Sequence, residues 1–277
     1  MKTKSLLISL VLCWLMASPL TLCAQATFQH PWQGKRVAFL GDSVWDPNSY
    51  KHIRKTWDFL SEWLGITPYV YAVSGNEWTA IPRQTRQLNA EHGDEVDAII
   101  VFIGTNDFLA GVPLGEWFSE KRVEVEQAVG HPKAPVNRIQ RTPVMSNDTY
   151  KGRINQAIGL LKKLYPTKQI VLLTPLHRAY ANFGDTNVQP DESYQNSAGL
   201  YIDDYVQVSK EAANIWSIPV IDLNAASGLN PMVEEQVPYF NNSETDRLHP
   251  NTEGHQRMAA TLFYQLLTLP VDWNILP

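Results

Sequence analysis

RVAFLGDS, residues Arg36 to Ser43, contains an unbroken apolar run from Val37 to Leu40, which is followed by a glycine and two polar residues. Four successive apolar side chains predict a strand over Arg36 to Leu40 that is buried on both faces. Strands of that kind occur in parallel sheets covered by helices, where ligands bind beyond the carboxyl ends of the strands. The turn Gly41-Asp42-Ser43 is therefore the first place to look for chemistry.

Four more apolar runs are similar to the first, and amphipathic stretches separate them. Strands are expected at Pro68 to Val73, Ala98 to Ile103, Gln169 to Thr174 and Pro219 to Leu223, and helices at Ser49 to Leu64, Pro82 to Glu91, Tyr150 to Leu164, Ala198 to Asn214 and Thr252 to Leu267. This alternation indicates an α/β fold of three layers, with a five-stranded, mainly parallel sheet between two layers of helices. No repeat or low-complexity linker is visible, so we expect a single domain over residues 27–277.

One connection in this pattern is long. It runs from Phe108 to Asp148 and contains three glycines and four prolines. Connections of this length are uncommon unless they are functional or carry structure of their own. We interpret residues 108–148 as an insertion that lines or covers the site, and a solvated excursion over the surface is the alternative.

The first 26 residues have the pattern of an export signal. Lys2 and Lys4 precede an almost wholly apolar run from Leu6 to Leu22, and small residues follow at Ala24 and Ala26. This pattern predicts a signal peptide over residues 1–26 and a protein exported to the periplasm or the extracellular space.

Both cysteines, Cys13 and Cys23, lie in the predicted signal peptide, so residues 27–277 contain no thiol. A lipid anchor on Cys23 is a weaker alternative, because Leu22 stands where a lipobox has a small residue. A cysteine nucleophile, a thiolate metal site and disulfides are excluded for the exported chain. Loss of the two signal lysines takes the formal net charge from −5 to −7. The acidic surface predicts a small-molecule or carbohydrate partner, no nucleic acid and no membrane insertion after signal removal.

Polar, glycine-bearing segments follow three of the predicted strands. They are Gly41-Asp42-Ser43, Ser74-Gly75-Asn76 and Gly104-Thr105-Asn106-Asp107. Each motif alone is ordinary turn chemistry, since glycine, asparagine and aspartate all favour turns. Because the carboxyl ends of parallel strands meet at one edge of a sheet, the three segments are expected to form one site.

One histidine stands out among the seven of the chain. Only His249 has an aspartate, Asp246, three positions before it. In a turn leading into the final helix, that spacing lets the carboxylate reach Nδ1 and leaves Nε2 facing a serine. Acyl transfer at a serine needs such a base and such an orienting group, so Ser43, His249 and Asp246 are predicted to form a catalytic triad. An Asp-x-x-His pair that merely caps a helix is the alternative.

In this order the motifs resemble those of the SGNH (GDSL-like) hydrolases, from Gly41 to the final helix. Val44 replaces the usual leucine of the first motif, and the second motif rests mainly on Gly75. The resemblance implies a flavodoxin-like sheet and an ester hydrolase that needs no cofactor. It also implies an oxyanion hole formed by the backbone N–H groups of Ser43 and Gly75 and the side-chain amide of Asn106.

The Gly-x-Ser-x-Gly elbow of α/β-hydrolases is absent, because Trp45 stands where its second glycine would be. No His-x-His or His-Glu-x-x-His motif is present either, and no metal is expected. Asp42 is expected to brace the serine turn, and Asp107 to support the Asn106 loop by local hydrogen bonds. The histidines other than His249 and His177 are interpreted as surface or loop residues. His255 is one of them.

The substrate is the part of the function that the sequence defines least. Trp45 and Trp78 lie close to the predicted site and could stack on sugar rings, although core packing explains them equally well. His177, which follows the fourth strand, is a further candidate for substrate contact. We predict a carbohydrate O-acetyl esterase. A lipase- or thioesterase-like acyl hydrolase and a catalytically inactive carbohydrate-binding protein are the alternatives, and the sequence does not give the oligomeric state.

Overall fold

A computed structural model describes residues 30–271 of the chain, so the predicted signal peptide over residues 1–26 lies outside the described part. Five strands form the central sheet in the order β2-β1-β3-β6-β9, and all four neighbouring pairs are parallel. Their bounds are β1 Arg36–Gly41, β2 Thr67–Val70, β3 Ala98–Phe102, β6 Gln169–Leu173 and β9 Val220–Ile221. The predicted α/β class and flavodoxin-like strand order are confirmed.

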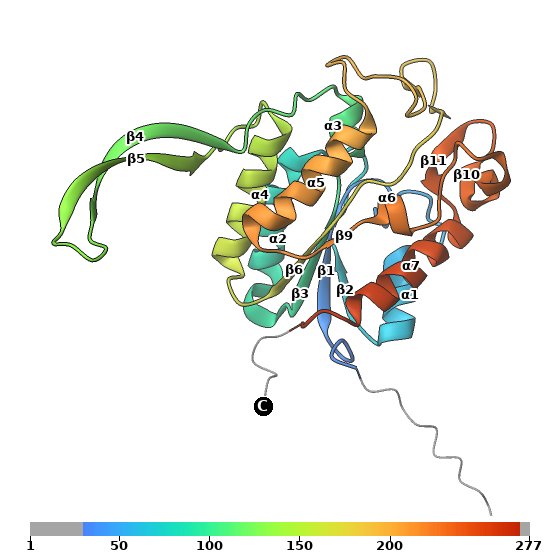
Figure 1. Ribbon diagram of the computed structural model, residues 1–277. Coiled ribbons are helices and arrows are strands. Elements are labelled where there is room, and N and C mark those ends of the chain that lie inside the picture. Colours follow the sequence, from blue (N-terminus) through green and yellow to red (C-terminus); the bar gives the residue numbers. More distant parts are fainter. Residues whose placement is uncertain (1–29, 272–277) are drawn as a thin grey trace, which may run out of the picture.

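Helices cover both faces of this sheet (Figure 1). One layer contains α2 (Ile81–His92), α4 (Tyr150–Leu164) and α5 (Ile202–Trp216), and the other contains α1 (Thr56–Leu64) and α7 (Thr252–Leu266). Alternate residues of β1 enter the two cores, because side chains of a strand point to opposite faces. Ala38 and Leu40 pack with the first layer, and Val37 and Phe39 with the second.

Two helices begin later than the sequence predicts. α1 begins at Thr56 rather than Ser49, and the carboxylate of Asp58 accepts a hydrogen bond from the backbone N–H of Lys55. α5 begins at Ile202 rather than Ala198, and Asp204 caps it in the same way through the N–H of Tyr201. An acid in the first turn that satisfies the N-cap backbone fixes each start.

A second, antiparallel sheet was not predicted. It has the order β10-β11-β7-β8, with bounds β7 Ala181–Asn182, β8 Val188–Gln189, β10 Phe240–Asn242 and β11 Asp246–Pro250. Short helices complete the described chain: η1 Trp78–Ala80, η2 Gly93–Glu95, α3 Thr105–Leu109, α6 Leu223–Ala226 and η3 Glu234–Tyr239. Asp246 and His249 therefore lie on a short strand and not in a simple turn.

The insertion folds mainly into an antiparallel hairpin of β4 (Phe118–Gln127) and β5 (Ala134–Pro143). It projects away from the α/β body (Figure 1). None of its strand residues lines the cavity around Ser43, although Leu109 and Ala110 of the same insertion do. The prediction that the insertion lines or covers the site is therefore wrong for the hairpin. Between residues 30 and 271, no helix has the length and apolar character needed to cross a membrane.

Candidate active site

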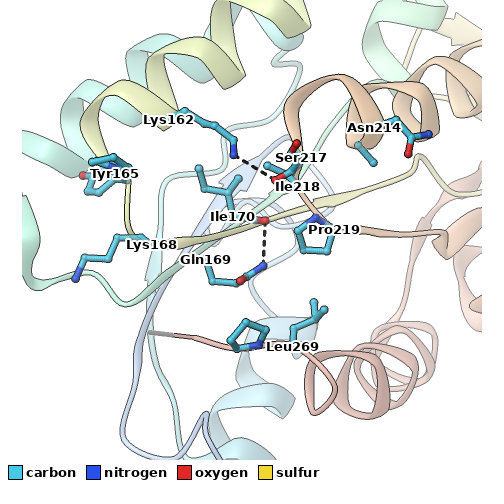
Figure 2. A pocket seen from close by; sticks show the side chains of 13 residues that line it. Lys162, Tyr165, Lys168, Gln169, Ile170, Asn214, Ser217, Ile218, Pro219 and Leu269 are labelled. Carbon is cyan, nitrogen blue, oxygen red and sulfur yellow. Dashed lines mark hydrogen bonds between the residues drawn. The ribbon is translucent and has the colours of Figure 1, made fainter. Parts of the chain in front are cut away.

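A cavity of about 470 Å³ lies at the carboxyl ends of the central strands. It is lined by Ser43, Ser49, Tyr50, Ser74, Gly75, Glu77, Asn106, Leu109, Ala110, Phe183, Asn187, Gln189, Leu248 and His249. A hollow of about 600 Å³ lies at the opposite end of the sheet, where β6 and β9 begin, and is shown in Figure 2. That hollow has Lys162, Tyr165 and Gln169 on its wall but no serine–histidine pair, so the smaller cavity is the candidate site.

Ser43, His249 and Asp246 form one continuous chain of contacts. Nε2 of His249 lies 2.8 Å from Oγ of Ser43, and Nδ1 lies 3.0 Å from each carboxylate oxygen of Asp246. All three residues are buried. The structure therefore brings together three residues that the sequence separates by up to 206 positions.

Four further donors surround the carboxylate of Asp246. The backbone N–H groups of Leu248 and His249 donate to Oδ1, while the hydroxyl of Tyr50 and the amide of Asn241 donate to Oδ2. Burial alone would raise the pKa of Asp246, but the contacts with His249 and Tyr50 outweigh it and lower the pKa below its ordinary value. Asp246 is therefore ionised at neutral pH, next to the imidazole.

The serine turn is braced from inside, as the sequence predicts for Asp42. Its carboxylate accepts the backbone N–H of Val44 at 3.1 Å. The neighbouring Asp46 accepts both the N–H and the hydroxyl of Ser74, at 2.8 and 2.7 Å, and so ties the serine turn to the segment that carries Gly75. Burial raises the pKa of Asp42 to about 7.

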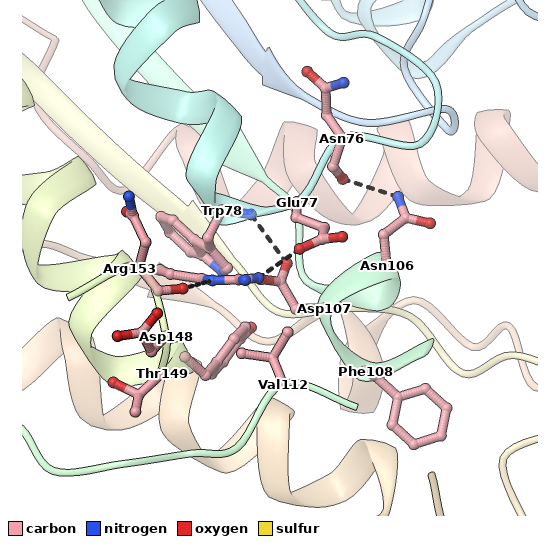
Figure 3. A network of polar contacts seen from close by, with 12 residues as sticks. Asn76, Glu77, Trp78, Asn106, Asp107, Phe108, Val112, Asp148, Thr149 and Arg153 are labelled. Atoms are coloured by element: carbon pink, nitrogen blue, oxygen red, sulfur yellow. Dashed lines mark hydrogen bonds and ion pairs between the residues drawn. The ribbon is translucent and has the colours of Figure 1, made fainter. Parts of the chain in front are cut away.

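Asn106 extends from the start of α3 toward the segment that follows Gly75 (Figure 3). Its amide donates to the backbone oxygen of Asn76 at 2.9 Å, and an amide nitrogen carries a second proton for another acceptor. Within the described residues, the backbone N–H groups of Ser43 and Gly75 donate no hydrogen bond. The three donors singled out in the sequence thus belong to residues that line one cavity and have unused capacity.

Asp107 is held by long-range contacts, which corrects the expectation of local ones. Its carboxylate accepts the backbone N–H of Trp78 at 3.0 Å and a guanidinium N–H of Arg153, on α4, at 2.8 Å. Arg153 also lies 2.5 Å from Glu77, which lines the cavity (Figure 3). Burial raises the pKa of Asp107 to about 6 despite the opposing charge of Arg153.

Comparison with known proteins relates this geometry to a family. The GDSL-like Lipase/Acylhydrolase family matches residues 39–257. The chain belongs to this family. The resemblance seen in the sequence is thereby confirmed, and the family implies ester-hydrolysing activity. A search of curated proteins found no match.

Several solved structures have the same fold as this GDSL-like hydrolase. A protein from Lactobacillus plantarum is 22% identical with a TM-score of 0.64, and the match covers 85% of this chain and 98% of that one. A possible lipase from Chitinophaga pinensis is 19% identical with a TM-score of 0.60, over 86% and 99% of the two chains. A member of the lipolytic G-D-S-L family from Veillonella parvula is 15% identical with a TM-score of 0.54, over 85% and 100%.

Trp45 and Trp78, for which the sequence left sugar stacking and core packing equally open, are fully buried in this hydrolase. Trp45 packs between Phe39 and Phe102, with ring centroids 5.2 and 5.1 Å away, and Trp78 packs against Tyr150. Neither ring is accessible to a substrate, so of the two interpretations core packing is correct and substrate contact is not supported.

Two histidines also differ from expectation. Nδ1 of His177 lies 2.7 Å from a carboxylate oxygen of Glu192, which raises the pKa of His177. His177 does not line the cavity of Ser43, so the structure does not support substrate contact. His255, interpreted as a surface or loop residue, is fully buried on α7 with Nδ1 2.9 Å from the hydroxyl of Thr56.

Sequence reasoning missed the part of the cavity wall that surrounds His249. Tyr50 and Phe183 pack against the His249 ring, with centroids 5.2 and 5.5 Å away. The buried guanidinium of Arg178 donates to the backbone oxygen of Thr105 and to Gln189, and so links this wall to the Asn106 loop. No motif marks these residues, because they reach the site through the unpredicted β7–β8 hairpin and an irregular turn.

Proposed function

We propose that this GDSL-like hydrolase is a serine esterase that cleaves carboxylic esters through Ser43, His249 and Asp246. The observation that carries the proposal is the double contact of His249, with Nε2 at 2.8 Å from the Ser43 hydroxyl and Nδ1 at 3.0 Å from Asp246. A base in hydrogen-bond reach of a serine and oriented by a carboxylate is the arrangement that acyl transfer requires.

In the first step His249 takes the hydroxyl proton as Ser43 attacks the acyl carbon. The developing oxyanion is stabilised by the free backbone N–H groups of Ser43 and Gly75 and by the second amide proton of Asn106. His249 then returns the proton to the leaving alcohol, and a water activated by the same imidazole releases the acid from the acyl-enzyme. Asp246 stays ionised throughout and holds the proton of the imidazole on Nδ1.

We propose a carbohydrate O-acetyl ester as the substrate. The two tryptophans no longer support this assignment, and the support comes instead from the cavity wall. Glu77 and Asn187 line the cavity with side-chain acceptors and donors that suit sugar hydroxyls. The exposed ring of Phe183 offers an apolar face at the same cavity.

A lipase-like acyl hydrolase is the second candidate. Leu109 and Phe183 are both more than a third exposed at the cavity, and a longer acyl chain could lie against them. The two candidate functions therefore predict a different dependence of the hydrolysis rate on the length of the acyl chain.

Hydrolysis of p-nitrophenyl acetate, butyrate and octanoate by the wild type and by Ser43→Ala tests both statements. We expect activity that is lost in the variant and that falls steeply from acetate to octanoate. A rate that rises with chain length would favour the lipase-like candidate, and equal activity of both proteins would refute the role of Ser43. If neither protein is active, the wild type is incubated with acetylated polysaccharide. Release of acetate would indicate an esterase, and binding without release would indicate an inactive carbohydrate-binding protein.

We also propose that the protein is exported with removal of residues 1–26. The N-terminal sequence of the protein recovered outside the cytoplasm tests this directly. A start near residue 25 or 27 is expected, whereas a lipid-modified Cys23 at the N-terminus would support the anchored alternative.

A further inference from the structure

The hairpin β4–β5 is a two-stranded ribbon that leaves the α/β body and exposes apolar side chains. Ten residue pairs join the strands, from Phe118 with Pro143 to Gln127 with Ala134, and the ribbon projects from the body (Figure 1). Two-stranded ribbons are marginal in water, and independent stability needs three or more strands or a packed face. Val125 and Ile139 are nevertheless 45% and 54% exposed on it. A hairpin of this kind gains most from additional strands.

The charges of the hairpin differ between its strands. β5 carries only two charged side chains, Arg138 and Arg141, and two prolines that lack a backbone donor. β4 has no proline and carries both signs of charge in the stretch Glu120 to Glu126 (EKRVEVE). Pairing of two β5 strands would bring arginines together and would lack the backbone N–H groups that the prolines do not have. The edge of β4 is therefore better suited to pair with a second copy of itself.

The ion pairs already made within the hairpin define a register for that pairing. Glu120 is bonded to Arg141 at 2.9 Å, and Glu126 to Lys133 at 2.7 Å. In residues 30–271, no ion pair or hydrogen bond involves the side chains of Arg122 or Glu124, which lie between these two glutamates. Arg122 and Glu124 thus place a free cation and a free anion on one face of β4, while Lys121, which also makes no ion pair within the described residues, lies on the other face with Val123 and Val125.

We propose that two copies of this chain associate through their β4 edges, antiparallel about a two-fold axis at Val123, and form a four-stranded sheet β5-β4-β4-β5. In this register Arg122 of each copy lies opposite Glu124 of the other, and the two Val123 side chains meet on the other face. The ends bring Glu120 opposite Glu126, each already neutralised within its own hairpin.

Other registers are worse on the same grounds. A slip of one residue pairs the face that carries Lys121, Val123 and Val125 in one copy with the face that carries Arg122 and Glu124 in the other. A slip of two residues places Arg122 opposite Arg122, or Glu124 opposite Glu124, across the axis. The partner is therefore a second copy of this chain, and the contact is isologous.

Sedimentation equilibrium of the full chain at micromolar concentration tests the association. We expect a dimer for the wild type and for the control Lys163→Glu, which reverses an exposed charge on α4. Arg122→Glu and Glu124→Arg alone should each be monomeric, because like charges then face each other. The double variant Arg122→Glu/Glu124→Arg should regain the dimer, since opposite charges meet again.

Disulfide cross-linking tests the register of the two β4 strands without relying on charge. In a chain with Cys13 and Cys23 changed to serine, Val123→Cys should form a disulfide-linked dimer on oxidation. Ser119→Cys should not, because residue 119 of one copy lies opposite residue 127 of the other. A monomeric wild type, a double charge variant that stays monomeric, or equal cross-linking at residues 119 and 123 would overturn the proposal.

Discussion

The hydroxyl of Tyr50 donates a 2.6 Å hydrogen bond to Oδ2 of Asp246, across 196 positions of sequence. The Tyr50 ring also packs against His249, and the residue holds this place with a φ of 49°, a backbone conformation that is strained for a tyrosine. Tyr50 therefore orients the carboxylate and forms part of the cavity wall at the same time.

Tyr50→Phe separates these two contributions, since phenylalanine keeps the ring and loses the donor. We expect kcat to fall about tenfold, in line with loss of one hydrogen bond to a charged group, while KM stays unchanged. Steady-state kinetics on p-nitrophenyl acetate measure both. Tyr264→Phe, at an exposed position of α7, is the matched control. Unchanged kcat in Tyr50→Phe would show that the remaining donors orient Asp246 on their own.

Asp246→Asn should lower kcat by about 10,000-fold with the fold retained. An amide cannot hold the proton of the imidazole on Nδ1, so Nε2 loses its role as base toward Ser43. Active-site titration and a thermal melt of the same sample separate loss of chemistry from loss of structure. A fall of less than tenfold would contradict the triad assignment.

Asn106→Ala removes the proposed side-chain donor to the oxyanion. Turnover should slow by about 100- to 1,000-fold. Because the same amide also bonds the Asn76 backbone, Asn76→Ala serves as a control that alters this turn and keeps the donor. Equal rates in the two variants would assign Asn106 to loop structure alone.

Arg153→Met leaves the carboxylate of Asp107 buried without its cation. We expect the free energy of unfolding to fall by about 3–5 kcal/mol. The loss should be larger at pH 8 than at pH 5, because protonation relieves the unpaired carboxylate at low pH. Urea unfolding measures it. Arg153→Met/Asp107→Asn should recover most of the stability, and a double variant as weak as the single one would argue against this ion pair as the cause.

Asp42 predicts a pH dependence of stability. Its pKa in the folded protein is about 7, against an ordinary value of 3.8. The folded state therefore keeps a proton that the unfolded chain releases, and the stability from this group is complete below about pH 4 and lost as the pH rises through about 7. Relative to Asp42→Asn, the wild type should lose stability between pH 5 and pH 7.5 in urea unfolding. A difference that is constant with pH would contradict the raised pKa.

The sequence predicts the central strands well, because burial on both faces requires apolar side chains at every position. Strands such as Ala98 to Phe102 read as continuous apolar runs and lie where they were expected. The order of Ser43, Asp246 and His249 along the chain likewise indicated one site, because strand ends meet at one edge.

Other features depend on contacts that a local pattern does not encode. Trp45 follows Ser43 by two residues, yet its ring is buried in the core. Closeness to Ser43 along the chain does not predict the direction of the side chain. The phenol of Tyr50 reaches the cavity from an irregular turn, and Phe183 reaches it from the short β7–β8 hairpin. The cap at Asp58 shortened a helix whose apolar pattern extended further.

The hairpin leaves the α/β body after Trp117 and returns at Val144, whose N–H bonds the Trp117 carbonyl at 3.0 Å. The two ends of the hairpin therefore meet at this backbone hydrogen bond. Neither strand of the hairpin belongs to the central sheet. The elements that carry Ser43 and His249 lie outside this segment. The surface proposed for self-association and the residues proposed for catalysis thus belong to separate parts of one chain, and each can be altered without touching the other.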